Sequence, residues 1–176
     1  MPAGEKSFER RKFLGMGLVV TSAGTLASCA RRNDPPWRFL TAEEASTVEA
    51  ICEQIIPTDR DPGATQAGGV NYIDLQLTKH LKRHQRTYLQ GIAAVDEASR
   101  ARFGRVLADL PFAQQTEVLT DIEKSAKPFF ELIVAHTMQG FYGDPRHGGN
   151  RDGASWKMLG LPYPPVRGRI SYVPKG

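Results

Sequence analysis

Apolar residues recur at helical spacing through most of this 176-residue chain, and this spacing limits the fold more than any other feature. The first such segment carries Val48, Ile51, Cys52, Ile55 and Ile56. No alternation of apolar and polar residues lasts long enough to predict a β-sheet. The pattern therefore predicts an all-α fold, a compact single-domain bundle of about five to six helices with a long glycine-rich C-terminal loop region.

Local signals place the ends of the expected helices. Thr41 and Glu44 form the pair of a capping box, so a helix should begin there and end at Pro57. Asn71 is expected to cap a second helix, which continues past Leu81. Further helical segments are expected from Gln85 or Thr87 to Ala101, over 103–110, from Gln114 to Ala126 and from Phe129 to Phe141.

Residues 1–29 have the layout of an export signal. Arg10 and Arg11 precede an uncharged stretch, residues 13–28, that is too short to span a bilayer comfortably and is diluted by glycine, serine and threonine. Together with Phe13 and Leu14, the arginine pair resembles the twin-arginine consensus, although neighbouring positions depart from it. We therefore expect export through the twin-arginine (Tat) translocase. The alternative is an ordinary secretory signal that happens to contain two arginines.

The signal closes with Leu26-Ala27-Ser28-Cys29, which resembles a lipobox. Lipidation of Cys29 would anchor the protein to a membrane on its periplasmic side. Cleavage beside a small residue without lipidation is the alternative. Residues 30–40 contain paired prolines and are expected to form a spacer, and the helical domain is expected to fill residues 41–176.

The net charge of the chain is +4, and part of it belongs to the signal. Residues 1–29 hold four basic and two acidic side chains, which leaves about half of the net charge for the remainder of the chain. A charge this small does not suggest a nucleic-acid partner, which usually requires a strongly basic surface.

Cys52 is the one cysteine that remains if Cys29 is lipidated. It stands in the apolar stripe of the first expected helix, which favours a buried and inert thiol. An intersubunit disulfide is the alternative, because an unpaired cysteine in an exported protein can pair between chains.

The chain has no local motif for a common cofactor: it lacks Cys-x-x-Cys-His, a dinucleotide glycine fingerprint, a phosphate loop and Gly-x-Ser-x-Gly. His80 and His84 stand four apart in the second expected helix, but the cations around them oppose a metal ion. We interpret them as part of a solvated basic helix face. His136, on the most apolar helix, is expected to be a hydrogen-bonded core histidine. No catalytic residue and no metal site is assigned.

A short polar segment is the best candidate for a functional site. It carries His147, Gly149, Asn150, Arg151 and Asp152, and Trp156 follows. One interpretation is the active site of a self-standing redox or hydrolytic enzyme. The other is a glycine-shaped loop, held by side-chain hydrogen bonds to the backbone, that forms a partner surface. We favour the loop because no nucleophile or cofactor motif accompanies it.

Two groups of residues carry a family resemblance. The C-terminal group is Phe129-Phe130-Glu131-Leu132, His136-Thr137, Gly140-Phe141-Tyr142, Asp144-Pro145, Gly148-Gly149-Asn150-Arg151-Asp152-Gly153, Trp156-Lys157 and Gly160-Leu161-Pro162. The N-terminal group is Ile55-Ile56-Pro57-Thr58-Asp59, Pro62-Gly63-Ala64 and Tyr72-Ile73-Asp74. From about Leu40 to Pro162 the chain thus resembles the gluconate 2-dehydrogenase subunit 3 family.

The resemblance implies a small, helical, non-catalytic (gamma) subunit of a membrane-bound dehydrogenase of sugars, sugar acids or polyols. In that family the large subunit, of the GMC type, carries FAD, and a cytochrome c subunit with haem c often passes electrons onward. The small subunit supplies the export signal and aids maturation of the large one, and it would bind no cofactor itself. A structural lipoprotein without such partners is a further alternative.

Overall fold

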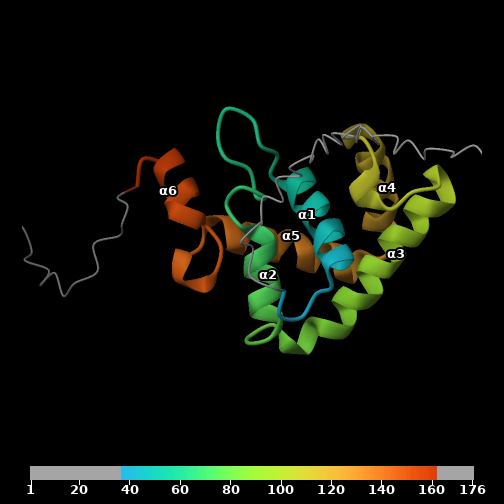
Figure 1. The fold of residues 1–176 in the computed structure, drawn as a ribbon, viewed down its shortest axis with the longest axis horizontal. Coiled ribbons are helices and arrows are strands. Elements are labelled where there is room, and N and C mark those ends of the chain that lie inside the picture. The colour runs from blue at the N-terminus through green and yellow to red at the C-terminus, as the bar shows by residue number, and fades with distance from the viewer. Residues whose placement is uncertain (1–36, 162–176) are drawn as a thin grey trace, which may run out of the picture. The chain divides into compact units, whose positions relative to one another are not determined.

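In the computed structural model, which describes residues 37–161, six α-helices follow one another and no β-strand occurs within that range (Figure 1). Their bounds are α1 Ala42–Ile55, α2 Gly69–Leu77, α3 Gln85–Phe103, α4 Phe112–Ser125, α5 Lys127–Tyr142 and α6 Ala154–Met158. Short 3₁₀ turns span Lys82–His84, Leu107–Asp109, Pro145–His147 and Arg151–Gly153. The predicted all-α fold is confirmed.

The predicted signal residues Arg10, Arg11, Phe13 and Leu14 lie outside the described range, as does the predicted lipidation site Cys29. None of the described helices is both long and apolar enough to cross a membrane.

Helix α1 begins with the predicted capping box. The Thr41 hydroxyl accepts the backbone N–H of Glu44 at 3.1 Å, and the Glu44 carboxylate accepts the backbone N–H of Thr41 at 2.8 Å. Each side chain thus satisfies a backbone donor that the first turn leaves without an intrahelical partner. The apolar stripe of α1 turns inward, and Val48 and Ile51 are fully buried.

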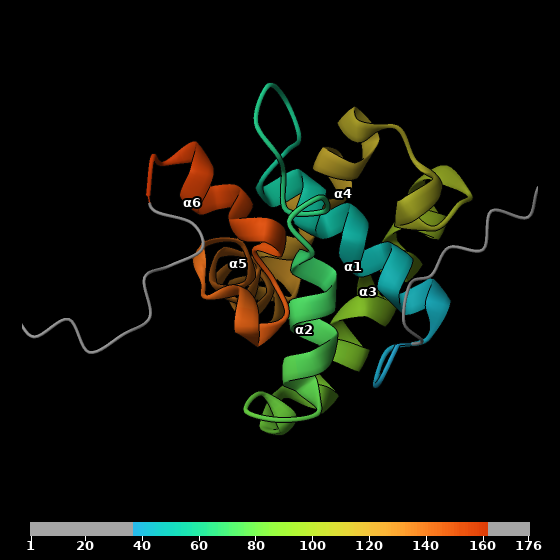
Figure 2. The same ribbon diagram turned by 60° about the vertical axis from the view of Figure 1, so that its left-hand side comes forward.

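The core lies where α1 and α5 meet the other long helices. Each of these two helices contacts α2, α3 and α4, and they contact each other. Ile73 from α2, Tyr88 from α3, Val118 from α4 and Ile133 from α5 are buried beside the stripe of α1. Burial of such side chains contributes roughly 1.5–3 kcal/mol each relative to exposure. In Figure 2, α5 is seen nearly end-on, with α2 and α6 beside it.

Residues 37–40 pack on α2 and belong to the folded domain, although they were expected to be spacer. The buried carboxylate of Asp74 accepts the backbone N–H groups of Arg38, Phe39 and Leu40 at 2.9, 2.9 and 3.0 Å. Leu40 is buried in the core, and Trp37 packs against it. Residues 30–36 of the expected spacer lie outside the described range. The difference from the prediction therefore concerns residues 37–40 alone.

Both ends of α2 differ from the sequence-based prediction. The helix begins at Gly69 after Gly68, whose φ of 78° is left-handed, and Asn71 lies inside the first turn and does not cap it. The helix ends at Leu77, so His80 and His84 do not share a helical face. The side-chain amide of Gln85 donates to the Leu77 carbonyl at 2.9 Å, which satisfies one backbone acceptor at this end.

Other predicted segments differ from the structure by a few residues. Phe103 completes α3, and the expected helical piece over 103–110 is reduced to the turn Leu107–Asp109. Helix α4 starts at Phe112, two residues before the predicted Gln114, and Pro111 stands in the N-cap position with extended backbone angles. Beyond α5, the expected glycine-rich region holds two 3₁₀ turns and the short helix α6.

Candidate partner-binding surface

The loop between α5 and α6, residues 143–153, is organised by the fully buried side chain of Asn150. Its Nδ2 donates to the Gly143 carbonyl at 2.8 Å, and its Oδ1 accepts the backbone N–H of Ser155 at 3.0 Å. One amide therefore joins the end of α5 to the start of α6. A buried amide satisfied on both sides stabilises a single loop conformation, whereas an unsatisfied one would destabilise it.

Helix α2 supports the loop from the other side. The side-chain amide of Asn71 donates to the Gly148 carbonyl at 2.6 Å, and that of Gln76 donates to the His147 carbonyl at 2.9 Å. The backbone N–H of Arg151 donates to the Ala67 carbonyl at 2.9 Å, just before α2. Sequence reasoning missed Asn71 and Gln76, because hydrogen bonds to residues more than 70 positions away leave no local signal.

Glycine is required where the loop touches the helices. A Cβ on Gly149 would collide with the carbonyl oxygen of Gly140 on α5. A Cβ on Gly148, whose φ is 99°, would lie 2.9 Å from the Leu75 side chain. The glycines of the predicted motif thus allow backbone to pack directly on helix.

Two residues without that freedom also have left-handed backbone, Asn150 with φ of 44° and Asp152 with φ of 54°. Asparagine and aspartate tolerate this region better than most residues, yet it still costs of the order of 1 kcal/mol. For Asn150, the two side-chain hydrogen bonds offset that cost. The side chain of Asp152 is exposed.

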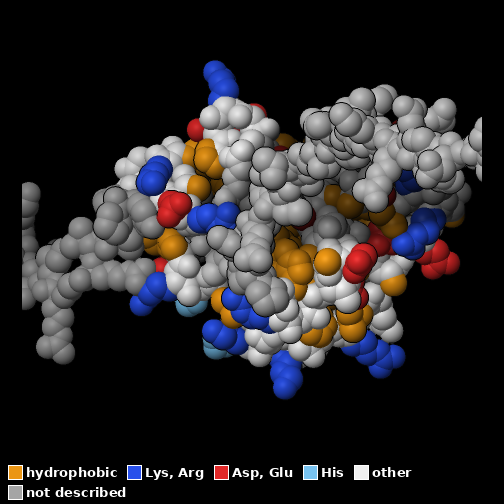
Figure 3. All heavy atoms as spheres, in the orientation of Figure 1, with side chains coloured by type: hydrophobic (Ala, Val, Ile, Leu, Met, Phe, Trp, Pro, Cys, Tyr) orange, Lys and Arg blue, Asp and Glu red, His pale blue; other side chains and the backbone are white. Residues whose placement is uncertain are grey.

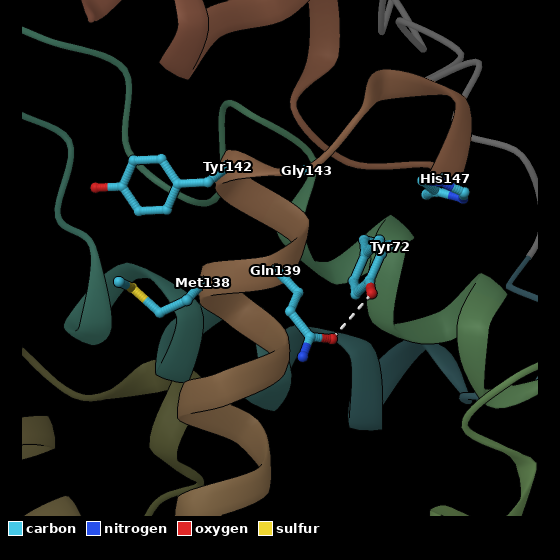
Figure 4. A pocket seen from close by; sticks show the side chains of 6 residues that line it. All are labelled: Tyr72, Met138, Gln139, Tyr142, Gly143 and His147. Atoms are coloured by element: carbon cyan, nitrogen blue, oxygen red, sulfur yellow. Dashed lines mark hydrogen bonds between the residues drawn. The ribbon is translucent and has the colours of Figure 1, made fainter.

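The polar side chains of the candidate segment do not converge on one cavity. His147 lines an open depression of about 480 Å³ with Tyr72, Met138, Gln139, Tyr142 and Gly143 (Figure 4). Arg151 and Asp152 line another, of about 490 Å³, together with Asp61, Pro62, Gln66, Ala154, Lys157 and Met158. An active site in this segment would need a general base beside a carboxylate. His147 and Asp152 do not form that arrangement, because they line different depressions.

Exposed apolar side chains flank the loop on both helices. Met138 is 42% and Tyr142 is 39% exposed on α5. Met158, Leu159 and Leu161 are exposed on and after α6. The Trp156 indole donates to the Tyr142 carbonyl at 2.9 Å, which ties the two helices together. We call Met138, Tyr142, Met158, Leu159 and Leu161 the α5–α6 surface; such a concentration of exposed apolar groups is typical of a protein interface.

Cys52 is fully buried, and its Sγ lies 3.3 Å from the Thr137 hydroxyl. Burial raises the pKa of the thiol to about 12, so the reactive thiolate is suppressed. This placement favours the buried, inert thiol over the intersubunit disulfide, because the sulfur cannot reach another chain while α1 stays packed.

His136 is buried, and its Nδ1 lies 2.8 Å from the Tyr88 hydroxyl. Burial, and then Coulombic interactions with His84 and Arg83, lower the pKa of His136 to about 4. The ring of His84 lies 5.7 Å from that of His136, and its Nε2 accepts the Arg83 Nε–H. His136 is thus a hydrogen-bonded core histidine, as expected. Within residues 37–161 no cluster of three or more His, Cys, Asp or Glu side chains has the geometry to hold a metal ion.

Comparison with known proteins identifies the family. Neither a curated protein nor a solved structure matches the chain. The model of the family described as gluconate 2-dehydrogenase subunit 3 matches residues 42–162, which is well over half of the chain and includes all six helices and the loop at 143–153. The chain therefore belongs to the gluconate 2-dehydrogenase subunit 3 family, as an accessory subunit of a dehydrogenase complex.

Proposed function

We propose that this subunit provides the export signal for a folded, FAD-containing dehydrogenase subunit and stays bound to it on the periplasmic side of the membrane. The observation that carries the proposal is the arginine pair Arg10 and Arg11 in front of a domain that belongs to a subunit family. A twin-arginine signal directs folded protein to export. A partner that binds this subunit before export would therefore cross with it, and binding in the cytoplasm would also aid its maturation.

The α5–α6 surface is the proposed docking site for that partner. It joins exposed apolar side chains to a loop whose conformation is fixed by Asn150 from within and by Asn71 and Gln76 from α2. Stable subunit interfaces have apolar centres, and a preorganised surface loses little conformational entropy on binding. The exposed side chains of His147, Arg151 and Asp152 would form its polar rim, and the half-buried indole of Trp156 would lie beside them.

In the proposed complex the chemistry resides in the partners. The large subunit, of the GMC type, would hold FAD and oxidise a sugar, sugar acid or polyol, and a cytochrome c subunit with haem c would accept the electrons. Lipid on Cys29 would hold this subunit at the membrane. Two or more acyl chains give firm anchoring, whereas a single chain gives only marginal binding.

Export of the flavoprotein tests the proposal directly. The flavoprotein subunit is expressed with this chain carrying Arg10→Lys and Arg11→Lys, and its activity and flavin content are measured in the periplasmic fraction. We expect loss of periplasmic flavoprotein and accumulation of it in the cytoplasm. Lys12→Arg is the matched control, because it keeps a cation at the adjacent position and leaves the arginine pair intact. Undiminished export of active flavoprotein by the double variant would contradict the proposal.

A further inference from the structure

We propose that the turn between α2 and α3 docks this domain on anionic phospholipid headgroups. The surface, here called the basic turn, consists of Lys79, His80, Lys82, Arg83, His84 and Arg86. The sequence pattern suggested only a solvated basic helix face. The structure shows a different arrangement, because α2 ends at Leu77, Lys79 to His84 form the connection to α3, and Arg86 lies in the first turn of α3.

Positive charge is concentrated in the basic turn without compensation. From Asp74 to Asp96 the chain has no acidic residue in between, and Asp74 is buried with its oxygens occupied by backbone N–H groups. The lysines and arginines of the turn are all exposed. Within the described part of the chain, the ion pairs involve other cations, at Arg38, Arg102, Lys127 and Arg146. The charge of the turn is therefore available to an external anion.

The basic turn occupies one end of the described fold. In Figure 1 the connection from α2 to α3 forms the lower end, and Figure 3, in the same orientation, shows Lys, Arg and His side chains gathered along that edge. The Asp and Glu side chains visible on this face lie higher. A surface with cations at its tip and acids set back from it can approach a negatively charged plane without repulsion.

The cations are presented from a fixed backbone. Leu81 is buried, and its N–H donates to the Gln76 carbonyl at 2.8 Å. The N–H of His84 donates to the Leu81 carbonyl at 2.8 Å, and the Gln85 side chain closes the end of α2. Only the side-chain ends need to be ordered on binding, so the entropic cost is small. Leu89, 41% exposed, stands three residues after Arg86 on α3, where an apolar group can enter the headgroup layer.

The position of the N-terminal segment favours a membrane over an acidic protein as the occupant. Asp74 holds residues 38–40 on the half of α2 that leads into the basic turn. Both Figure 1 and Figure 2 show the start of the described chain towards the same lower end. Cys29 is eight residues before Trp37, so a lipid there would lie at most about 28 Å away along an extended chain. In this respect the inference rests on the proposed anchoring: an anchored domain would have its basic turn within reach of the bilayer.

Vesicle binding by the unlipidated protein tests docking by the basic turn separately from lipid anchoring at Cys29. The mature chain, residues 29–176 with Cys29→Ser, is sedimented with vesicles of phosphatidylcholine alone or of phosphatidylcholine and phosphatidylglycerol. We expect binding to the anionic vesicles only, and its loss as salt rises to about 1 M, where charges more than about 3 Å apart are screened. No binding to anionic vesicles would overturn the inference. Absence of lipid from Cys29 in the mass of the native protein would instead contradict the proposed anchoring.

Two triple variants with the same change of charge locate the contact. Lys79→Gln, Lys82→Gln and Arg86→Gln remove cations of the basic turn and leave Arg83 beside His84. Arg60→Gln, Arg100→Gln and Lys124→Gln remove exposed cations on the loop before α2, on α3 and on α4. At about 1 kcal/mol for each cation near an anionic surface, the first variant should bind at least about tenfold more weakly. The second should bind nearly as well as the parent.

Three results would overturn the assignment of the basic turn to lipid. Equal weakening of both triple variants would show a general effect of net charge. Unchanged vesicle binding by the first variant would place the contact elsewhere. Weakened binding to the purified flavoprotein, with vesicle binding intact, would make the turn a protein contact. Equal thermal unfolding of both variants and the parent is checked first, so that loss of binding reports on the surface.

Discussion

Gly149 packs its backbone directly against the backbone of Gly140, so that the loop after α5 rests on the helix without an intervening side chain. Both residues are buried. The contact brings the loop close enough for Asn150 to reach Gly143. The candidate partner surface thus depends on a pair of glycines as much as on its polar residues.

The first prediction concerns this close approach. Gly149→Ala would force its Cβ into the carbonyl oxygen of Gly140 and should lower the free energy of unfolding by about 2–3 kcal/mol. Urea denaturation measures the change. Gly104→Ala is the control, because Gly104 has φ of 73° but nothing within 4 Å of an added Cβ, so backbone strain alone should cost about 1 kcal/mol. Equal effects of the two substitutions would mean that the contact with Gly140 is not tight.

The second prediction concerns the buried amide. Asn150→Asp replaces the Nδ2 donor with an oxygen that faces the Gly143 carbonyl and should destabilise the protein by roughly 2–4 kcal/mol at pH 7. Lower pH should restore part of the stability relative to the parent, because a protonated carboxyl can donate. Urea denaturation at pH 7 and at pH 5 measures both effects. A stability difference that does not change with pH would argue against a donor role for this atom.

The third prediction concerns the N-terminal segment. Asp74→Asn retains one oxygen but turns the other into an amino group that faces a backbone N–H, so residues 38–40 should detach more often. Limited trypsin digestion should then cut after Arg38 at least about tenfold faster, the equivalent of about 1.4 kcal/mol in local opening. Asp109→Asn makes the same change at an exposed position and should leave cleavage at Arg38 as it is.

The fourth prediction concerns pH. Burial of His136 lowers its pKa to about 4, whereas an unfolded histidine has a pKa near 6.5, so the unfolded state binds more protons between these values. Stability should therefore be fully present above about pH 6.5 and decline as the pH falls towards 4, by about 2–3 kcal/mol. Urea denaturation from pH 7.5 to 4.5 measures the decline, which should flatten in His136→Gln. His80→Gln, at an exposed histidine, should keep the slope of the parent.

The fifth prediction concerns the α5–α6 surface. Met138→Glu places a charge among its exposed apolar groups and should weaken binding of the purified flavoprotein by at least about tenfold, as expected for a charge in the apolar centre of an interface. Isothermal titration calorimetry measures the affinity. Phe112→Glu is the control: Phe112 is 51% exposed on α4, outside the proposed surface, and its substitution should leave the affinity almost unchanged. A larger effect at Phe112 would move the docking site to α4.

Features encoded by neighbouring residues could be predicted from the sequence. Thr41 and Glu44 are three positions apart, so their capping box is visible in the sequence and recurs in the structure. The burial of His136 likewise followed from its apolar helix. The all-α fold followed from a spacing that repeats in every long segment.

Features that depend on distant partners could not be predicted. Asn71 has a residue type that commonly caps helices, but its amide is used by Gly148, 77 positions away. No glycine or proline marks the end of α2 at Leu77. At this end the Leu81 N–H donates to the Gln76 carbonyl, and the Gln85 side chain donates to the Leu77 carbonyl. Consequently His80 and His84 were wrongly placed on one helix. The sequence indicated where the candidate segment lies. It did not indicate that Asn150 is buried while Arg151 and Asp152 are exposed.

Helix α2 links the N-terminal segment of the described domain to the loop of the candidate partner surface. One side chain, Asp74, holds residues 38–40, which follow the predicted export signal along the chain, and two others, Asn71 and Gln76, hold the loop of the candidate partner surface. A pull on the chain ahead of Trp37 would therefore load α2, through these three hydrogen bonds to Asp74, as well as α1, into which residues 38–40 continue. During translocation, the pulling force and the cargo would meet at the same nine-residue helix.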